Sequence, residues 1–383
     1  MRWCDADFPP RVRVTNDIVE RTGYSVPAVE FALDALFGEL RTTALLETIA
    51  RELGEPIALD ASASRMLPLG RIAILSSRTT IGVAIPAMCF ALCAKNDVIV
   101  KDREDHLVAA FAETLREELE AFDRALHVES WDARHEGTHL QDARLIVVYG
   151  NDDTIAQVTS EHAGSARTIG FGSRTSIGFL DAAAQGDPAA RAAAFAGAAR
   201  DASLYEGEGC MSLHALFFER SSACDPNELA TEFAAAMERA TIEFPVGVRS
   251  ASQRAAMLQE RNLAAFRAAA GNGAAFCDEQ LGFLVLLAPP IQEAPKFLPR
   301  TVVMLPVGSP EEIVTYVERH ALPVECLGVT GTPRSYAEIA SRIGVARIAS
   351  LGEMQRPPLG AHHGGRPRIA EYVRFLDFDG EHV

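Results

Sequence analysis

The sequence predicts an α/β protein with two domains, each built on a largely parallel sheet. Its 383 residues exceed one minimal domain and suit two. Short apolar runs alternate along the chain with longer amphipathic or alanine-rich segments. Strand, helix and strand at this spacing are typical of right-handed βαβ units, in which the strands run parallel.

The first half alternates predicted helices and strands. Residues 25–53 are expected to be helical, because Leu33, Leu36 and Leu40 recur at helical spacing. Residues 84–94 are apolar on all sides and predict a buried helix. Strands are expected at residues 71–75, 97–101, 126–129, 144–149 and 167–171, and further helices at 105–124 and 152–160.

The second half repeats this pattern. Asp187 and Pro188 begin a long alanine-rich helix that is expected to reach about residue 203. A second α/β domain beginning near residue 173 accounts for the pattern. Further helices are expected at residues 225–242, 249–270, 309–320 and 333–343, and strands at 214–218, 283–287, 301–305 and 346–348.

Composition and charge exclude several classes of protein. The 52 acidic and 36 basic residues give a formal net charge of −16, which disfavours nucleic-acid binding. No apolar run is long enough to span a bilayer, and the N-terminus lacks the apolar core of a secretory signal, so a cytoplasmic protein is expected. The seven cysteines do not predict a disulfide framework. No metal site is expected, since Cys89 and Cys93 lie on the apolar helix with no other ligand beside them.

Polar segments follow three of the predicted strands. They are residues 76–80, 101–104 and 150–153. Ligands of open parallel sheets bind at the carboxyl ends of the strands, so these segments are the candidates for a binding site.

Cys210 differs from the other cysteines in its surroundings. A long predicted helix ends before it, a glycine-rich turn contains it, and a predicted strand follows at once. Glycines beside a cysteine let a substrate approach the sulfur and free backbone N–H groups to stabilise an oxyanion. From the residues alone, a nucleophile and a buried cysteine at a tight turn are equally well supported.

Two segments carry a family resemblance. The sequence GEGC at residues 207–210 resembles the G-Q-x-C nucleophile segment of the aldehyde dehydrogenase superfamily. The sequence FALCAKNDVIVKDRE at residues 90–104 resembles the superfamily segment A-L-A-A-G-N-x-V-V-x-K-P-x-E. An aldehyde-dehydrogenase-like fold is therefore expected, with a cofactor domain and a catalytic thiol domain.

Further segments resemble the LuxC-type acyl-CoA reductases, or fatty acid reductases, of that superfamily. The resemblance covers roughly residues 20–380 and implies reduction of an acyl-CoA thioester to an aldehyde. The segments are RTGYS (21–25), YGNDDT (149–154), RDASLY (200–205), GVARI (344–348), HHG (362–364) and EYVRFLD (371–377).

The resemblance also implies roles for individual residues. Cys210 would form the acyl-enzyme, Lys101 and Glu104 would contact the adenosine ribose, and Gly150 with Asn151 would lie near the pyrophosphate. A helix N-terminus suits that anion. NADPH is the implied cofactor and NADH is possible, because a glutamate such as Glu104 favours free ribose hydroxyls. Ser76 and Ser77, which follow the first strand of the predicted cofactor domain, are also cofactor candidates.

Two positions depart from the superfamily pattern. The glutamate that activates water for hydrolysis should fall near Gly170, where no carboxylate occurs, which favours a reductase. The oxyanion-binding amide should fall near Arg78, and an arginine there would either stabilise the oxyanion and thiolate or block the site. Glu206 and Glu208 flank the nucleophile and are expected to raise its pKa. His214 is expected to be a core or surface histidine rather than a catalytic residue.

These interpretations define an expected organisation with two alternatives. Residues 1–172 would hold the N-terminal helices and the cofactor domain, 173–365 the catalytic thiol domain, and 366–383 a strand that joins subunits into a homodimer. The expected partners are an acyl-CoA or acyl-carrier thioester and an acyl-activating protein. The alternatives are an oxidising aldehyde dehydrogenase and a non-catalytic scaffold homologue.

Overall fold

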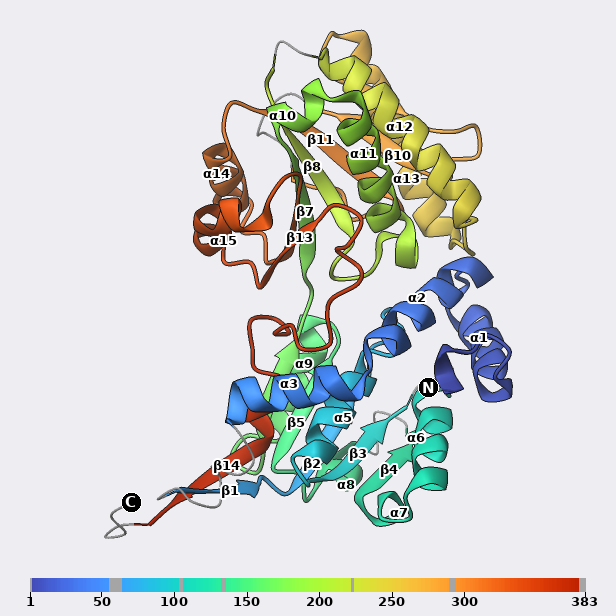
Figure 1. Ribbon diagram of the computed structural model, residues 1–383. Coiled ribbons are helices and arrows are strands. Elements are labelled where there is room, and N and C mark those ends of the chain that lie inside the picture. Colours follow the sequence, from blue (N-terminus) through green and yellow to red (C-terminus); the bar gives the residue numbers. More distant parts are fainter. Residues whose placement is uncertain are drawn as a thin grey trace. The chain divides into compact units, whose positions relative to one another are not determined.

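The chain forms two compact units. The computed structural model describes residues 2–54, 64–102, 106–131, 136–221, 224–288 and 294–378 (Figure 1). The first unit contains Met1–Thr22, Val29–Ser173 and Pro358–Val383, and the second contains Gly23–Ala28 and Arg174–Pro357. The predicted thiol domain ran to residue 365, whereas the segment from Pro358 onward packs with the first unit.

The first unit is built on a five-stranded sheet in which every pairing is parallel. Its order is β4-β3-β2-β5-β6, so the chain runs from β2 through β3 to β4 on one side and then crosses to β5 and β6 on the other side of β2. A ligand crevice is expected at such a reversal, at the carboxyl ends of the strands. The strands are β2 (Arg71–Leu75), β3 (Asp97–Lys101), β4 (Leu126–Glu129), β5 (Leu145–Tyr149) and β6 (Arg167–Phe171), close to the predicted ranges.

Helices accompany this sheet, and two predicted helices are shorter than expected. The helix predicted over 25–53 is interrupted because Arg41 has an extended backbone (φ −111°, ψ 147°). The helix predicted over 105–124 ends at Glu118, since its buried apolar stripe stops at Ala112 and Leu119 is extended. The helices are α1 (Pro9–Thr22), α2 (Val26–Glu39), α3 (Thr42–Leu53), α5 (Ala84–Cys93), α6 (Leu107–Glu118), α7 (Phe122–Ala125), α8 (Glu136–Leu140) and α9 (Asp152–Glu161).

A separate two-stranded sheet joins distant parts of the chain. β1 (Ser64–Pro68) pairs antiparallel with β14 (Val373–Asp377), with Met66 opposite Phe375 (Figure 1). β14 coincides with the predicted last strand. Its expected role in joining subunits stays a prediction.

The second unit is built on a seven-stranded sheet of order β13-β12-β7-β8-β11-β10-β9, parallel except for β9. β7 and β12 were not predicted, because serine, glutamate and glycine residues interrupt their apolar runs, yet both are buried along their whole length. The strands are β7 (Thr175–Leu180), β8 (Leu213–Glu219), β9 (Ala274–Phe276), β10 (Leu284–Leu287), β11 (Thr301–Val307), β12 (Val324–Val329) and β13 (Arg347–Ser350).

Alternate residues of each strand enter two hydrophobic cores, one on each face of this sheet. Leu216 and Phe218 of β8 pack into the core that includes α11 and α12, whereas Ala215 and Phe217 pack with α14 and α15. This arrangement of helices on both faces of a parallel sheet is the doubly wound one. The helices are α10 (Ala182–Gly186), α11 (Pro188–Ser203), α12 (Pro226–Glu243), α13 (Ala251–Ala269), α14 (Glu311–Arg319) and α15 (Ala337–Ile343).

α11 matters most for the site, because it leads directly to Cys210. Asp187 caps its N-terminus by accepting hydrogen bonds from the N–H groups of Ala189 and Ala190. Gly197 in its middle lies so close to the segment after β13 that an added Cβ would be 2.4 Å from the carbonyl oxygen of Leu351. The absence of a side chain at Gly197 therefore sets how closely α11 packs.

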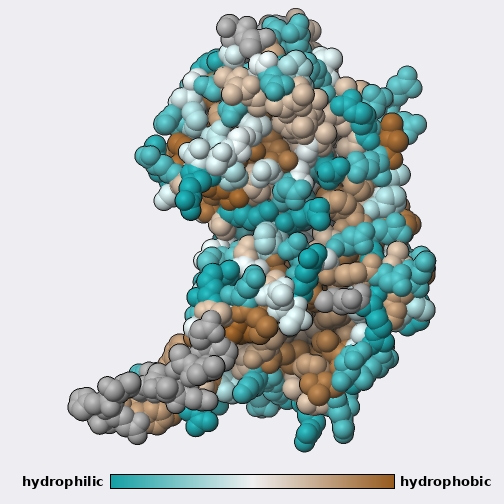
Figure 2. Space-filling model, viewed as in Figure 1, coloured by the Kyte–Doolittle hydropathy of each residue, from teal (hydrophilic) through white to brown (hydrophobic). Residues whose placement is uncertain are grey.

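The surface is mixed in hydropathy. Figure 2 shows hydrophilic side chains spread over the viewed face, with smaller apolar patches between them. None of the helices in the described part of the chain combines the length and apolarity that crossing a bilayer requires.

Gly197→Ala should lower the free energy of unfolding by about 1 to 3 kcal/mol, because the new methyl group overlaps backbone that has no room to move. Urea denaturation followed by circular dichroism measures the change. Gly186→Ala is the matched control, since an added Cβ there meets nothing within 4 Å. Equal midpoints for the two variants would contradict this packing.

Candidate active site

Cys210 lies in a loop whose backbone is strained. The loop joins α11 to β8 and begins with three consecutive residues of left-handed conformation: Tyr205 (φ 54°), Glu206 (φ 54°) and Gly207 (φ 77°). A residue with a side chain pays about 1–2 kcal/mol for this conformation. The turn therefore persists only because surrounding contacts hold it.

Polar contacts fix the backbone around Cys210 itself. Ser176 Oγ on β7 donates a 2.9 Å hydrogen bond to the carbonyl oxygen of Cys210 and accepts one of 3.1 Å from the N–H of Cys326 on β12. On the other side, Gln355 Nε2 donates to Ser212 Oγ at 3.0 Å and to the carbonyl oxygen of Asp201 at 3.2 Å. These bonds tie the loop to β7, β12 and the end of α11.

The electrostatic surroundings of the thiol act in opposite directions. Burial raises the pKa of Cys210 to about 12, and the carboxylate of Glu325 adds to this effect. The backbone N–H groups of Cys210 and Met211, together with Arg174, lower the pKa of the thiol. Cys210 is therefore a protonated thiol at neutral pH, with N–H groups close enough to its sulfur to stabilise negative charge.

Two buried titratable side chains flank β7 near Cys210. The registers of β8 and β12 against β7 both shift by one residue, at His214 and at Glu325 respectively. Bulges of this kind redirect a side chain and are common next to active sites. His214 is buried, its Nδ1 lies 3.2 Å from Thr175 Oγ1, and burial lowers its pKa, so it is a core histidine; that it takes no part in catalysis stays a prediction.

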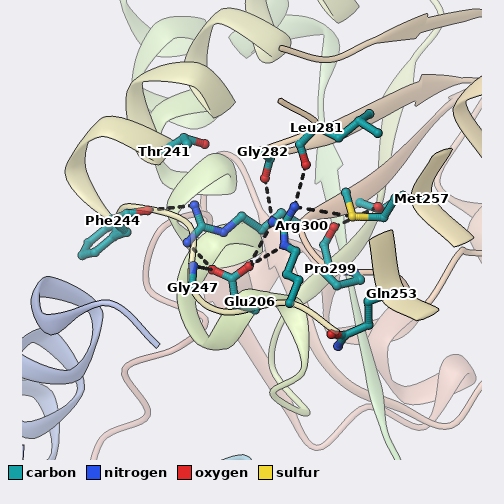
Figure 3. A network of polar contacts seen from close by, with 12 residues as sticks. Glu206, Thr241, Phe244, Gly247, Gln253, Met257, Leu281, Gly282, Pro299 and Arg300 are labelled. Carbon is teal, nitrogen blue, oxygen red and sulfur yellow. Dashed lines mark hydrogen bonds and ion pairs between the residues drawn. The ribbon is translucent and has the colours of Figure 1, made fainter. Parts of the chain in front are cut away.

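The two glutamates beside the nucleophile behave differently from expectation. Glu206 is buried and binds Arg249 and Arg300, which compensate its charge (Figure 3). Glu208 is exposed and accepts a 2.7 Å hydrogen bond from Gln253 Nε2. The carboxylate that acts most strongly on the Cys210 thiol is instead Glu325, on a different strand.

Three candidate cofactor residues follow neighbouring strands of the first unit. Ser76 and Ser77 follow β2, and Lys101 ends β3, which pairs directly with β2. The hydroxyl of Ser77 accepts from the N–H groups of Thr79 (3.2 Å) and Thr80 (3.4 Å), which forms a tight polar turn. Glu104 lies outside the described residues.

Lys101 is buried although it carries a charge. Its exposed fraction is 8%, and its Nζ lies 5.4 Å from the ring centroid of Trp131, a cation–π contact. Trp131 in turn stacks on His139 with ring centroids 4.4 Å apart, and His139 Nδ1 lies 2.9 Å from Glu129 Oε2. Lys101 is thus a preorganised cation at the carboxyl edge of the sheet.

Gly150 and Asn151 lie at the start of α9, after β5. Asn151 caps the helix by accepting a 2.8 Å hydrogen bond from the N–H of Thr154. Asp152 and Asp153 occupy the first turn, and such carboxylates already satisfy the positive end of the helix dipole. The predicted contact with a pyrophosphate stays a prediction, and these two charges act against it.

Gly170, where the family resemblance places the hydrolytic base, packs closely against α9. An added Cβ at Gly170 would lie 2.4 Å from Cγ2 of Ile155, on α9. A glutamate side chain at this point of β6 would therefore require the side chain of Ile155 to shift.

Arg78 and the paired histidines belong to the first unit, whereas Cys210 belongs to the second. Arg78 is exposed, and its carbonyl oxygen accepts a 2.6 Å hydrogen bond from Arg21 Nη1. Its predicted role at the oxyanion stays a prediction. His363 stacks on Phe171 with ring centroids 4.1 Å apart, and burial lowers its pKa to about 3, so it is a neutral packing residue. His362 is exposed.

The sequence interpretation missed several residues around Cys210. Ser176 and Glu325 were not considered, because their strands were not predicted. A glutamate within the apolar sequence VECLGV (324–329) was the available signal, since charges rarely occur within buried strands. Arg249 and Arg300 gave no comparable local signal.

The fold and the cysteine loop define a class of protein: one with the aldehyde-dehydrogenase-like fold. Aldehyde dehydrogenase 21 from Physcomitrella patens has a TM-score of 0.71 at 12% identity, over 96% of this chain and 83% of that one. A NAD-dependent benzaldehyde dehydrogenase from Corynebacterium glutamicum has a TM-score of 0.67 at 15% identity, over 97% and 82% of the two chains. The expected fold is thereby confirmed.

The family follows from the sequence. The family model described as Acyl-CoA reductase (LuxC) matches residues 1–375, and the chain belongs to this family. A long-chain acyl-protein thioester reductase 2 from Photobacterium leiognathi is 21% identical over 97% of this chain and 79% of that protein. The chain is therefore an aldehyde-forming oxidoreductase, and its family supports an acyl thioester as substrate.

Alkylation of Cys210 by iodoacetamide should accelerate steadily with pH, about tenfold per unit, with no plateau up to about pH 10. The reason is that the pKa of about 12 leaves only a small thiolate fraction throughout this range. Peptide mass spectrometry resolves Cys210 from the other six cysteines. A plateau near neutral pH would show that the thiol is activated in the free protein.

Proposed function

We propose that this protein reduces an acyl-CoA thioester to an aldehyde through an acyl-enzyme on Cys210, with NADPH as the hydride donor. The observation that carries the proposal is the loop at Cys210, in which the N–H groups of Cys210 and Met211 lie near the sulfur. Membership of the acyl-CoA reductase family supports the same reaction.

The loop at Cys210 supplies the two groups that thioester exchange requires, a sulfur nucleophile and N–H donors for the oxyanion. The Cys210 sulfur attacks the acyl carbon, the C–S bond to coenzyme A breaks, and the departing thiolate takes up the proton that Cys210 has lost. The N–H groups of Cys210 and Met211 are suited to stabilise the oxyanion that forms between these events. Ser176, which holds the carbonyl of Cys210, keeps these groups in place.

The residues of the first unit fit a nicotinamide nucleotide at the β3 side of the sheet. Lys101, buried at the carboxyl end of β3, is suited to bind the ribose or its 2′-phosphate, and Ser76 and Ser77 lie on the neighbouring strand end. When bound, a reduced nicotinamide supplies the hydride that converts the acyl group into an aldehyde. NADPH is favoured over NADH because a lysine matches a phosphate. A glyceraldehyde-3-phosphate dehydrogenase from Methanocaldococcus jannaschii with a related fold was solved with NADP (TM-score 0.67, 10% identity, 98% of this chain and 87% of that one).

An oxidising aldehyde dehydrogenase is less well supported. Its last step needs a base that activates water, and Gly170, where the resemblance places that base, carries no carboxylate. The non-catalytic alternative rests on Arg78 and on the glutamates that flank Cys210, and the pairing of Glu206 with two arginines weakens the second ground. The homodimer, the acyl-activating partner protein and the cytoplasmic location stay predictions.

Cys210→Ser should abolish covalent labelling by radioactive acyl-CoA and acyl-CoA-dependent oxidation of NADPH, because a hydroxyl at this site is a far weaker nucleophile. Cys277→Ser, at a partly buried cysteine of the same unit, is the control and should be labelled normally. Full labelling of the Cys210 variant would refute the mechanism. Production of NAD(P)H from aldehyde without coenzyme A would favour the oxidising alternative.

Lys101→Met should raise the KM for NADPH by roughly tenfold to a hundredfold, the loss expected for a hydrogen bond to a charged group. Steady-state kinetics with NADPH and NADH measures the effect, and a larger loss for NADPH would assign Lys101 to the 2′-phosphate. Lys95→Met removes an exposed lysine just before β3 and should leave both values unchanged. Unchanged kinetics in the Lys101 variant would place the cofactor elsewhere.

A further inference from the structure

Glu206 has no role in thioester exchange itself, yet it lies four residues before Cys210 and is the most heavily bonded side chain of the loop. Its carboxylate oxygens accept hydrogen bonds from Arg249 Nε (3.0 Å), the N–H of Gly247 (3.1 Å) and Arg300 Nη2, and Oε2 also lies 2.9 Å from Arg249 Nη2 as an ion pair (Figure 3). Only 7% of the side chain is exposed. One carboxylate therefore binds groups from two separate segments of the chain, at residues 247–249 and at residue 300.

The two arginines are themselves fixed by backbone carbonyl groups. Arg300 Nη1 donates to Phe244 (2.8 Å), whereas Arg249 donates from Nη1 to Leu281 (2.5 Å) and from Nη2 to Gly282 (2.7 Å). These carbonyls belong to the segments after α12 and before β10. Through these arginines Glu206 is therefore connected to the backbone of two other segments of the second unit.

Arg300 also holds the backbone of the turn. The N–H of Arg300 donates a 3.1 Å hydrogen bond to the carbonyl oxygen of Glu206. Gly207 packs so closely that an added Cβ would lie 3.1 Å from the nitrogen of Arg300. Glu206 is thus held by both its backbone and its side chain, in a left-handed conformation that residues with side chains seldom adopt.

The turn also determines where neighbouring groups lie. Tyr205, the other left-handed residue with a side chain, is coupled electrostatically to Cys210, and both burial and that thiol raise its pKa. The Tyr205 ring also lies against Gly209, because a Cβ added at Gly209 would be only 3.3 Å from Tyr205 Cδ2. Because Tyr205 to Cys210 form one short loop, a change at Glu206 is transmitted to the N–H groups beside the sulfur.

We propose that Glu206 is a positioning residue for Cys210: clamped by Arg249 and Arg300, it fixes the left-handed turn that aims the N–H groups of Cys210 and Met211 at the reacting carbonyl. This inference rests on the proposed function of Cys210. It differs from a purely structural role, since an ion cluster that only stabilises the fold has no effect on acyl transfer in the folded protein.

Glu206→Gln should slow acyl transfer from acyl-CoA to Cys210 by roughly tenfold to a hundredfold, because small displacements of oriented groups have effects of this size. Alkylation of the same thiol by iodoacetamide needs no oxyanion stabilisation, so it should change much less. The measured quantity is the ratio of the two single-turnover rates, read on the Cys210 peptide by mass spectrometry. The ratio should fall at least about tenfold.

Two controls separate positioning from loss of stability. Glu232→Gln makes the same substitution at a glutamate paired with Arg191 on the surface of the second unit, 2.7 Å from Oε2 to Nε, and should leave the ratio unchanged. Leu229→Ala removes a fully buried side chain of α12 and lowers stability without touching the loop. It should also leave the ratio unchanged in the folded protein.

A double variant covers the case in which Glu206→Gln fails to fold with two buried cations. Asp278 also acts electrostatically on Arg300. Combining Glu206→Gln with Arg249→Met removes one carboxylate and one arginine, so that Asp278 and Arg300 remain as one negative and one positive group. The double variant should show the same fall in the ratio. Equal changes in acyl transfer and alkylation, in whichever variant folds, would overturn the inference. If the wild-type protein is alkylated but never acylated at Cys210, the proposed function fails and the inference fails with it.

Discussion

The left-handed turn at residues 205–207 is the constraint on which the site of the second unit depends. α11 ends at Ser203 and β8 begins at Leu213, so the chain must reverse and present Cys210 within a few residues. Two residues with side chains adopt a conformation that costs energy, and this cost is offset by contacts elsewhere. The close packing at Gly197 fixes the helix before the turn, and Ser176 fixes the backbone after it.

A buried strand can be predicted from the sequence when its apolar residues form an uninterrupted run. β5 has the sequence LIVVY and needs no partner to be recognised, because β-branched and aromatic residues dominate it. β7 and β12 are equally buried, but Ser176, Gly178, Glu325 and Gly328 interrupt their apolar runs. Ser176 hydrogen-bonds to the carbonyl oxygen of Cys210 and Glu325 raises the pKa of its thiol, and packing on both faces overrides local propensity in these strands.

The same distinction holds within the site. Cys210 and Lys101 could be singled out because each lies in a local motif, a glycine-rich turn in one case and a strand end in the other. The sequence shows Glu206 only as a negative charge near Cys210, which predicts that it raises the pKa of the thiol. Its two arginine partners, which compensate that charge, lie far along the chain and could not be predicted. Long-range ion pairs have no periodicity, so composition and spacing do not predict them.

The high pKa of Cys210 is compatible with a thiol that carries an acyl group. A thiolate of higher pKa is intrinsically more nucleophilic but leaves more slowly from a thioester. Burial and Glu325, which keep the free thiol protonated, would therefore also make the acyl–sulfur bond at Cys210 less prone to cleavage by water. The lack of a carboxylate at Gly170 and the slow departure of the Cys210 thiolate both disfavour hydrolysis of the acyl-enzyme. Under the proposed mechanism, the acyl-enzyme persists until hydride reaches it, and the oriented N–H groups supply the activation that a low pKa would otherwise provide.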